Sequence, residues 1–357
     1  MNNIKFFIAR RKKLSYINKI IILMLIISFF PKINFFYKIK DNEYIPQFKF
    51  DEVNSFYPDA KNFDLNLNKK KCRKIFKYKP NNEKDLVILA YEFQNRSLEH
   101  NLFMDIAIEK VLNSYRNSIP LAHFICFVPK KSFQTKIVSK LKKSGIEIII
   151  IKNSNEHIAN RRFIESYIFL KKYRKFYERV LLIDFKDIYI FGDIFATIGK
   201  NDLFVNYNCN KESKKLENCI KFFNSINKNW FYRNMNKYNT NKKQVKKFEE
   251  IKPITIIVGV FIGGIKNFFK FIELYSYKLV EFNNKNQMKS FGYEQVLFNY
   301  LFYLGYFDKF NLKANKKTTK FFYENSRCSP ILIHKNYPIS WIRRTKFDKF
   351  KESLFVR

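Results

Sequence analysis

Carboxylates gather directly after a short apolar segment in the middle of the chain. Val180 to Ile183 are apolar without interruption, and Asp184 and Asp187 follow at once. Such a run is typical of a strand that is covered on both faces in an α/β sheet. A strand of this kind delivers its last side chains to the carboxyl edge of the sheet, where open α/β folds bind ligands. Carboxylates collected there suit a hard divalent cation that also holds phosphate, although an Asp after a strand can also simply cap the next turn.

Glycines interrupt a second apolar run, Ile254 to Gly264, at Gly259 and Gly263. Glycine weakens a strand, so its repeated use indicates that a ligand or another backbone comes close. A bulge or a turn into the next helix explains the same pattern equally well. Gly259 and Gly263 are therefore candidates for lining a binding site.

Two features near the end of the chain could add polar groups to such a site. Glu294 and Gln295 open a helix whose N-terminus would point polar groups at a bound anion or hydroxyl. His334 ends the short strand SPILIH, and a His at a strand end can complete a carboxylate metal site. The competing interpretation of His334 is a surface residue with an ordinary hydrogen-bond partner.

The elements that must position these residues alternate between strand and helix. Apolar runs predict strands over 85–91, 121–128, 146–151 and 179–183, and helical spacing predicts helices over 98–115, 132–143 and 158–177. Strands separated by helices imply a parallel sheet with right-handed crossovers, an α/β fold with helices on both faces. Beyond the acidic cluster we expect a strand over 202–207, a polar insertion over 211–250 anchored by Trp230 and Phe231, and helices over 267–280 and 294–304.

The first strand ends Leu89-Ala90-Tyr91-Glu92 and lacks the G-x-G-x-x-G loop of dinucleotide-binding folds. It would instead offer backbone amides and the Tyr91 ring to a base. The alternative is that Tyr91 is an ordinary aromatic residue of the core or its rim.

The charge of the chain is strongly positive, because 68 Lys and Arg stand against 31 Asp and Glu, giving +37. Such a balance first suggests a nucleic acid or an anionic membrane surface as partner. The lysines are, however, spread along the whole chain among Asn, Ile, Phe and Tyr, which is typical of compositional drift, and no nucleic-acid motif is recognisable. We therefore predict no specific nucleic-acid partner. With 42 Phe and 22 Tyr in 357 residues, the chain has ample apolar side chains for a large core.

The N-terminal residues combine a basic flank with a hydrophobic segment. Met1–Lys19 has no acidic residue, and Ile20–Phe30 is almost entirely apolar. This short segment fits the h-region of a signal peptide, but Leu14–Tyr37 is long enough to cross a membrane, and no small-x-small cleavage site follows. We predict an uncleaved signal anchor that leaves the N-terminus in the cytosol and the rest of the chain in the lumen of the Golgi or ER, a single-pass type II topology. A buried N-terminal helix is the alternative.

These features divide the chain into three parts: a cytosolic tail and anchor over 1–37, a polar stem over 38–82, and a single large domain over 83–357. A luminal position agrees with the glycosylation sequon at Asn95. Cys126 lies within an apolar strand and is expected to be a buried free thiol. The remaining cysteines could form disulfides in a lumen, and the pairings Cys209 with Cys219 and Cys72 with Cys328 stay open.

Taken together, the order and separation of these features resemble nucleotide-diphospho-sugar transferases of the GT-A fold. The resemblance is to glycosyltransferase-like families whose acidic strand reads roughly L-x-D-x-R-D-x-x-F-Q-x-D-P-F. The matching positions here are Leu182, Asp184, Lys186, Asp187, Ile190, Phe191, Asp193, Ile194 and Phe195. The similarity extends from about Asp85 to Tyr337 and includes Arg161-Arg162-Phe163 ahead of the acidic strand.

The resemblance implies a role for each candidate residue. Asp184 and Asp187 would bind Mn²⁺ or Mg²⁺, with His334 as a third ligand, and the metal would hold the diphosphate of a nucleotide-sugar donor. Arg162 would face the donor phosphates or sugar, and Tyr91 would face the base. The remaining matches are Lys186 in the acidic motif, Gly259 and Gly263 where the families have N-A-G-V and a following Gly, and Glu294 and Gln295 in the catalytic pocket for sugar and acceptor. A divalent ion and a cationic side chain would neutralise the charge that grows on the leaving nucleoside diphosphate.

The sequence thus predicts a membrane-anchored, metal-dependent glycosyltransferase that moves a hexosyl or pentosyl group to a glycan, protein or lipid acceptor. It departs from the family pattern at three positions. Lys186 replaces an Arg, Ile257 replaces the Asn of N-A-G, and Glu294 replaces an Asp. Two other hypotheses therefore remain: a non-catalytic GT-A-like binding or partner protein, and a basic protein associated with a membrane or polyanion.

Overall fold

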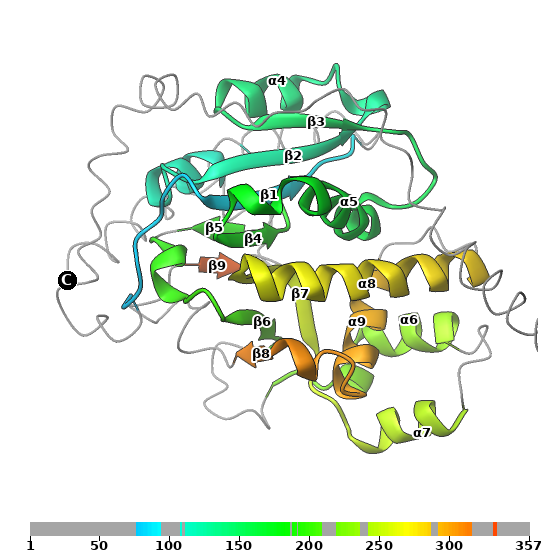
Figure 1. The fold of residues 1–357 in the computed structure, drawn as a ribbon. Helices are drawn as coiled ribbons and strands as arrows, with labels where there is room; N and C mark the ends of the chain where they lie inside the picture. Colours follow the sequence, from blue (N-terminus) through cyan, green and yellow to red (C-terminus); the bar gives the residue numbers. More distant parts are fainter. Residues whose placement is uncertain are drawn as a thin grey trace, which may run out of the picture. The chain divides into compact units, whose positions relative to one another are not determined.

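The computed structural model describes residues 76–93, 108, 111–185, 188–190, 192–208, 219–235, 242–286, 292–315 and 331–333. These residues form an α/β fold around a seven-stranded, mostly parallel sheet with the order β3-β2-β1-β4-β7-β6-β8 (Figure 1). The strands are β1 (Asp85–Ala90), β2 (His123–Pro129), β3 (Glu147–Ile151), β4 (Arg179–Ile183), β6 (Leu203–Tyr207), β7 (Ile256–Gly264) and β8 (Leu312–Asn315). The prediction of an α/β fold is confirmed.

Strand direction divides the sheet into two parts. β1 is parallel to β2 and β4, and β2 is parallel to β3, as the alternation of strands and helices predicts. β7 is antiparallel to both β4 and β6, and β6 is parallel to β8. Every residue of β7 is buried, so its apolar pattern carries no information about its direction. β8 was not predicted.

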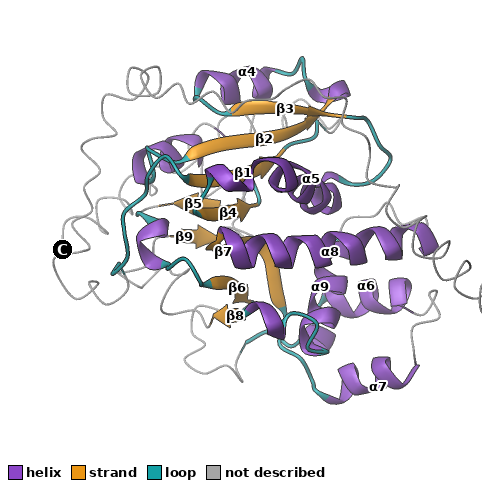
Figure 2. Cartoon of the chain, in the orientation of Figure 1, coloured by secondary structure: helices purple, strands orange, loops and turns teal. Residues whose placement is uncertain are grey.

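Helices cover both faces of this sheet (Figure 2). They are α4 (Lys136–Lys143), α5 (Ile158–Tyr173), α6 (Ile226–Met235), α7 (Lys242–Glu250), α8 (Ile265–Asn286), α9 (Tyr293–Tyr303) and a helix over 111–118. Successive side chains of a strand point to opposite faces. Accordingly, Phe127 of β2 contacts Phe169 of α5, and Phe261 of β7 contacts Phe163 of α5. In Figure 1, α5 and α8 lie side by side on this face, and they contact each other extensively.

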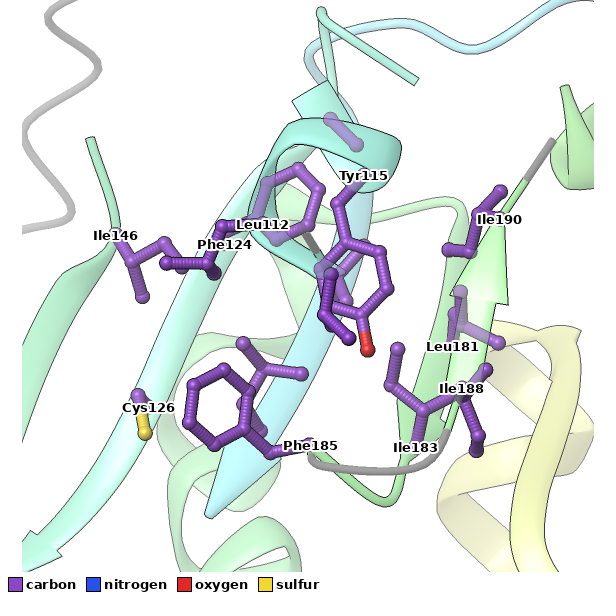
Figure 3. Packing of buried hydrophobic residues seen from close by; sticks show 14 of the residues in the cluster. Leu112, Tyr115, Phe124, Cys126, Ile146, Leu181, Ile183, Phe185, Ile188 and Ile190 are labelled. Atoms are coloured by element: carbon purple, nitrogen blue, oxygen red, sulfur yellow. The ribbon is translucent and has the colours of Figure 1, made fainter. Parts of the chain in front are cut away.

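The opposite face of the sheet carries a large hydrophobic cluster under the helix at 111–118 and α4 (Figure 3). Phe124 and Cys126 of β2 point into it, as do Leu181 and Ile183 of β4. The rings of Tyr115 and Phe124 stack with their centroids 6.1 Å apart. Cys126 is a fully buried free thiol, as predicted, and burial raises its pKa far above the usual range.

The polar insertion over 211–250 contains two helices that were not predicted, α6 and α7. Phe231, expected to be an anchor, is fully buried, and it packs with Phe222 and Phe248. Phe248 is the one described residue of α7 that is buried. Burial of this side chain stabilises the packing of the helix by roughly 1.5–3 kcal/mol. The nine residues of α7 include only two apolar side chains, Val245 and Phe248, which are too few to establish a helical period from the sequence.

A buried ion pair joins the starts of β1 and β4. Arg179 Nε donates to Asp85 Oδ1 at 2.7 Å, and Arg179 Nη2 donates to Asp85 Oδ2 at 2.6 Å. The same guanidinium donates to the backbone carbonyls of Lys79, Pro80 and Phe195. Burial raises the pKa of Asp85 to about 6, although the hydrogen bonds and charge of Arg179 act in the opposite direction. Arg179 therefore fixes the segment that leads into β1.

No helix within the described ranges is long and apolar enough to cross a membrane. The predicted signal anchor over 1–37 and most of the stem over 38–82 lie outside the described residues.

Gly292, directly before α9, adopts a left-handed backbone conformation with φ of 87°. A Cβ atom there would lie 2.6 Å from the Trp230 ring. We expect Gly292→Ala to lower the free energy of unfolding by about 1–3 kcal/mol, measured by chemical denaturation, because backbone strain and steric overlap both oppose it.

Gly305→Ala is the matched control for Gly292→Ala. Gly305 has a similar φ of 80°, but the nearest atom to its added Cβ would be Asp308 Oδ2 at 3.0 Å. Gly305→Ala should lower the free energy of unfolding by less than Gly292→Ala does, because the backbone strain is similar but the closest contact of the added Cβ is longer. Equal losses in the two variants would show that the contact with Trp230 has no energetic weight.

Candidate functional site

The candidate site lies at the carboxyl ends of β1 and β4, where the direction of chain progression across the sheet reverses. From β1 the chain moves outward to β2 and β3, then returns through α5 to β4 on the other side of β1 (Figure 1). Open α/β sheets bind ligands at such a switch point. Because β7 is antiparallel to β4, the start of β7 reaches the same edge. The edge thus collects Tyr91, Asp184, the first residues of β7 and the N-terminus of α5.

Asp184 directly follows β4 and is held by β7 and α5. Its backbone N–H donates to the carbonyl of Gly259 at 2.8 Å. Its Oδ1 forms an ion pair with Nη1 of Arg162, whose Nη2 donates to the carbonyl of Val258 at 2.8 Å. The Asp184 side chain is 27% exposed, whereas that of Arg162 is 4% exposed. The structure therefore brings Asp184, Arg162 and Gly259 together, with the carboxylate facing solvent and the guanidinium behind it.

Gly259 allows the Asp184 carboxylate to pack directly against the backbone of β7. A Cβ atom at this position would lie 2.7 Å from Asp184 Oδ2. Any side chain at position 259 would displace the carboxylate. A glycine within a strand predicts that another group comes close to the backbone, and at Gly259 that group is the Asp184 carboxylate.

Glu294 lies in the first turn of α9 with its side chain almost fully buried. Its Oε2 atom has no hydrogen-bond partner among the residues that the structure describes. Tyr275 Oη donates to the backbone carbonyl of Glu294 at 2.5 Å. Burial raises the pKa of Tyr275 well above its usual value, the charge of Glu294 adds to this rise, and the charge of Arg162 opposes it. Glu294 and Arg162 are thus close enough to act on the same phenol.

Gln295, the neighbour of Glu294, is engaged in holding the fold. Its Nε2 donates to Asn227 Oδ1 of α6 at 2.6 Å. One turn further along α9, Asn299 binds both the N–H and the carbonyl of Ile256, at 2.7 and 2.9 Å. These bonds attach α9 to the first residue of β7 and fix Glu294 relative to the sheet edge.

Tyr91 is placed differently from the other candidates. Its side chain is 3% exposed and belongs to the hydrophobic cluster, where its ring meets the edge of Phe185 at 6.2 Å. The next residue, Glu92, forms an ion pair with Lys131 at 2.7 Å. At the end of β1, Glu92 is thus the more accessible polar side chain, and Tyr91 is a core residue.

Gly263 does not lie beside Asp184. In the β4–β7 ladder, Gly263 is opposite Val180 at the start of β4, whereas Gly259 accepts the N–H of Asp184 beyond its end. A Cβ at Gly263 would lie 2.7 Å from the carbonyl oxygen of Asp202. This glycine therefore allows close packing of β7 on the chain before β6, which is the approach of another backbone that glycine in a strand indicates.

Three candidates, Lys186, Asp187 and His334, lie outside the described residues. The strands next to them in the sequence, β5 (Ile188–Ile190) and β9 (Ile331–Ile333), form a separate antiparallel ladder that pairs Ile188 with Ile333. Within the described part of the chain, no group of three or more His, Cys, Asp or Glu could hold a metal ion.

Two further polar residues of α5 are buried: Asn160, which the sequence analysis did not single out, and Arg161, which it named only within the Arg161-Arg162-Phe163 match. Asn160 is fully buried, and neither amide atom has a hydrogen-bond partner in the described structure. Arg161 Nη2 donates to the Lys152 carbonyl at 2.6 Å and to Glu165 Oε1 at 3.0 Å, which ties the β3–α5 loop to the helix. The polar triplet Asn-Arg-Arg in the first turns of α5 is the signal in the sequence that could have found Asn160.

Cys219 is disulfide-bonded.

No protein-family model matches the chain, and a search of curated proteins finds no significant match.

Proposed function

We propose that the protein is a glycosyltransferase of the GT-A fold that transfers a sugar from a nucleotide-sugar donor to a glycan, protein or lipid acceptor. The observation that carries the proposal is the cluster of Asp184, Arg162 and Gly259 at the switch point of the sheet. An accessible carboxylate beside a guanidinium suits a ligand that combines a cation with phosphate groups.

The proposed cofactor is Mn²⁺ or Mg²⁺, held by Asp184, Asp187 and His334. Asp184 fits such a group: its carboxylate already binds a positive charge, and its side chain is 27% exposed. Asp187 and His334 adjoin Ile188 and Ile333, which pair with each other, and this pairing supports a shared site. When bound, the metal would supply charge neutralisation for the diphosphate.

The side chains of this chain would divide the remaining tasks. The Arg162 guanidinium would bind phosphate oxygens with a forked pair of donors, and Lys186 would add a second positive charge. The Glu294 carboxyl, whose Oε2 lacks a partner in the described residues, would accept a hydrogen bond from a hydroxyl of the sugar or acceptor. Gln295 would act by positioning Glu294 through its bond to Asn227.

The proposed location is a single-pass type II membrane protein with its catalytic domain in the lumen of the Golgi or ER. The disulfide at Cys219 supports this, because disulfides persist in oxidising compartments and are rare in the cytosol.

One observation favours a second candidate, a non-catalytic GT-A-like binding or partner protein. Ile257 stands where the related families have an Asn, and its side chain is 5% exposed near the start of β7. This residue offers no polar group to a donor.

The two candidates are separated by thermal unfolding of the full-length chain with a panel of nucleoside diphosphates, each with and without Mn²⁺. A ligand that binds only the native state raises the unfolding midpoint. We expect one nucleotide to raise it by several degrees only when Mn²⁺ is present, because a ligand at 100 times its Kd adds about 2.7 kcal/mol. A well-folded sample without any nucleotide-dependent shift would favour the non-catalytic protein.

A further inference from the structure

We propose that the amino edge of the sheet, where β1, β2 and β4 begin, docks on the surface of a phospholipid bilayer that carries anionic headgroups. This edge is opposite the candidate site, which lies where β1 and β4 end. The inference is therefore independent of the proposed transferase activity. A protein docked in this way would keep the candidate site directed away from the bilayer.

Two exposed apolar side chains lie at this edge. Leu121, just before β2, is 44% exposed, and Phe176, just before β4, is 40% exposed. The segments that carry them meet across β1, because His123 Nδ1 and Tyr177 Oη are 2.7 Å apart in a hydrogen bond and their rings stack. Leu121 and Phe176 therefore belong to one surface. Exposed Leu and Phe beside cationic side chains are typical of protein surfaces that enter the headgroup region of a bilayer.

Cationic side chains gather around these apolar ones. Arg174 and Lys175 directly precede Phe176, and Lys175 Nζ lies 5.1 Å from the centre of the Phe176 ring. Glu178 in the same segment is 25% exposed and already pairs with two lysines, at 4.0 and 3.8 Å. Within the described residues 77–84, 174–178 and 199–202, Glu83 is the exposed acidic residue, and the exposed cations are Lys77, Lys79, Lys84, Arg174, Lys175 and Lys200. Such a surface is complementary in charge to an anionic bilayer.

The chain enters the described fold at the same edge. The description begins at Phe76, and Arg179 at the start of β4 donates to the carbonyls of Lys79 and Pro80 at 2.6 and 2.8 Å. The predicted signal anchor over 1–37 precedes these residues in the sequence. A membrane that holds the anchor is thus tethered to the amino edge, which favours a bilayer over a soluble polyanion as the partner.

The test uses tryptophan reporters in the full-length chain, Phe176→Trp on the amino edge and Ile226→Trp as the matched control. Ile226 is 60% exposed, and its neighbour Asn227 bonds to Thr255, just before β7, at the opposite edge. The protein is mixed with vesicles of brominated phosphatidylcholine that contain about 30 mol% phosphatidylinositol. After subtraction of the wild-type signal, we expect Phe176→Trp to lose at least about half of its fluorescence, because bromine in the bilayer quenches it, and Ile226→Trp to keep its fluorescence.

The role of charge is tested in the Phe176→Trp background. Replacement of three cations of the amino edge by Gln should reduce the quenching at least about 2-fold, because the attraction to anionic lipid falls. These substitutions are Lys84→Gln, Arg174→Gln and Lys175→Gln.

A control variant removes the same charge from exposed positions of α6 and α7. It should leave the quenching unchanged, because these helices are not part of the amino edge. Its substitutions are Lys228→Gln, Lys242→Gln and Lys247→Gln.

Vesicle-bound protein in which Phe176→Trp is not quenched would overturn the docking and leave the predicted anchor standing. If Phe176→Trp does not fold, Leu121→Trp serves as the reporter, with the same expected result. Equal loss of quenching in the two triple variants would also overturn the proposal, because net charge alone would then account for binding. Retention on heparin that depends on the three amino-edge cations, without quenching on vesicles, would assign the surface to a polyanion instead.

Discussion

Replacement of Asp187 by Ala is expected to weaken binding of a nucleoside diphosphate in the presence of Mn²⁺ by more than about 100-fold. Loss of a carboxylate ligand removes both a coordinating oxygen and a negative charge, and even residues that only support metal ligands change affinity by about 10–100-fold. The measurement is a titration of the nucleotide selected by thermal unfolding, with and without Mn²⁺, on the full-length protein.

Two outcomes define the result for Asp187. Glu250→Ala is the control, because Glu250 is an exposed carboxylate on α7 whose described ion pair with Lys246 is 4.0 Å long, and the variant should bind the nucleotide as wild type does. Equal affinity in Asp187→Ala and wild type, with both folded, would remove the basis for a metal at this residue.

The second large effect is expected at Asp85, on the opposite edge of the sheet. Asp85→Ala should lower the free energy of unfolding by about 3–5 kcal/mol, because it leaves the buried charge of Arg179 without its carboxylate. Chemical denaturation at neutral pH measures the loss. The variant Asp85→Leu with Arg179→Met removes both charges and should be more stable than Asp85→Ala. If this double variant is the less stable one, the bonds from Arg179 to backbone carbonyls outweigh the ion pair.

The pH dependence of stability gives a second measure of the Asp85 pair. The pKa of Asp85 in the folded protein, about 6, is above the ordinary value of 3.8, so the folded state holds this proton more tightly than the unfolded state does. The resulting contribution to stability is present at low pH and is lost as the pH rises from about 4 to about 6. Asp85→Ala should lack this component. If the free energy of unfolding changes by the same amount over that interval in wild type and in Asp85→Ala, the pKa of Asp85 is not raised in the folded protein.

The parallel half of the sheet was predictable because strand and helix differ there in period. Runs such as Val180–Ile183 have no polar residue, whereas α4 and α5 alternate with helical spacing. The direction of β7 and the existence of the edge strand β8 were harder to predict from the sequence. β7 is apolar throughout and would look the same in either direction, and β8 has only four residues, one of them an exposed lysine.

One residue of the candidate site, Asp184, could be placed from the sequence because it directly follows a predicted strand. Carboxylates that follow a buried strand must lie at its carboxyl edge, so Asp184 could be placed from the sequence. The partners of Asp184 depend on which helix and strand pack there, and the carbonyl of Val258 has no signature in sequence. Gly259 and Gly263 look alike in the sequence, yet the register of β7 against β4 sets them at opposite ends of the sheet.

The β5–β9 ladder sets an order of assembly during synthesis of the chain. All seven strands of the main sheet, the last ending at Asn315, leave the ribosome before Ile331–Ile333 does. A nascent chain can therefore bury most of its core while the partner of β5 does not yet exist, and domains begin folding during synthesis in this way. Completion of the segment that leads from β9 into His334 then follows the main sheet, so the proposed metal site would be assembled only on chains that have been translated beyond β9.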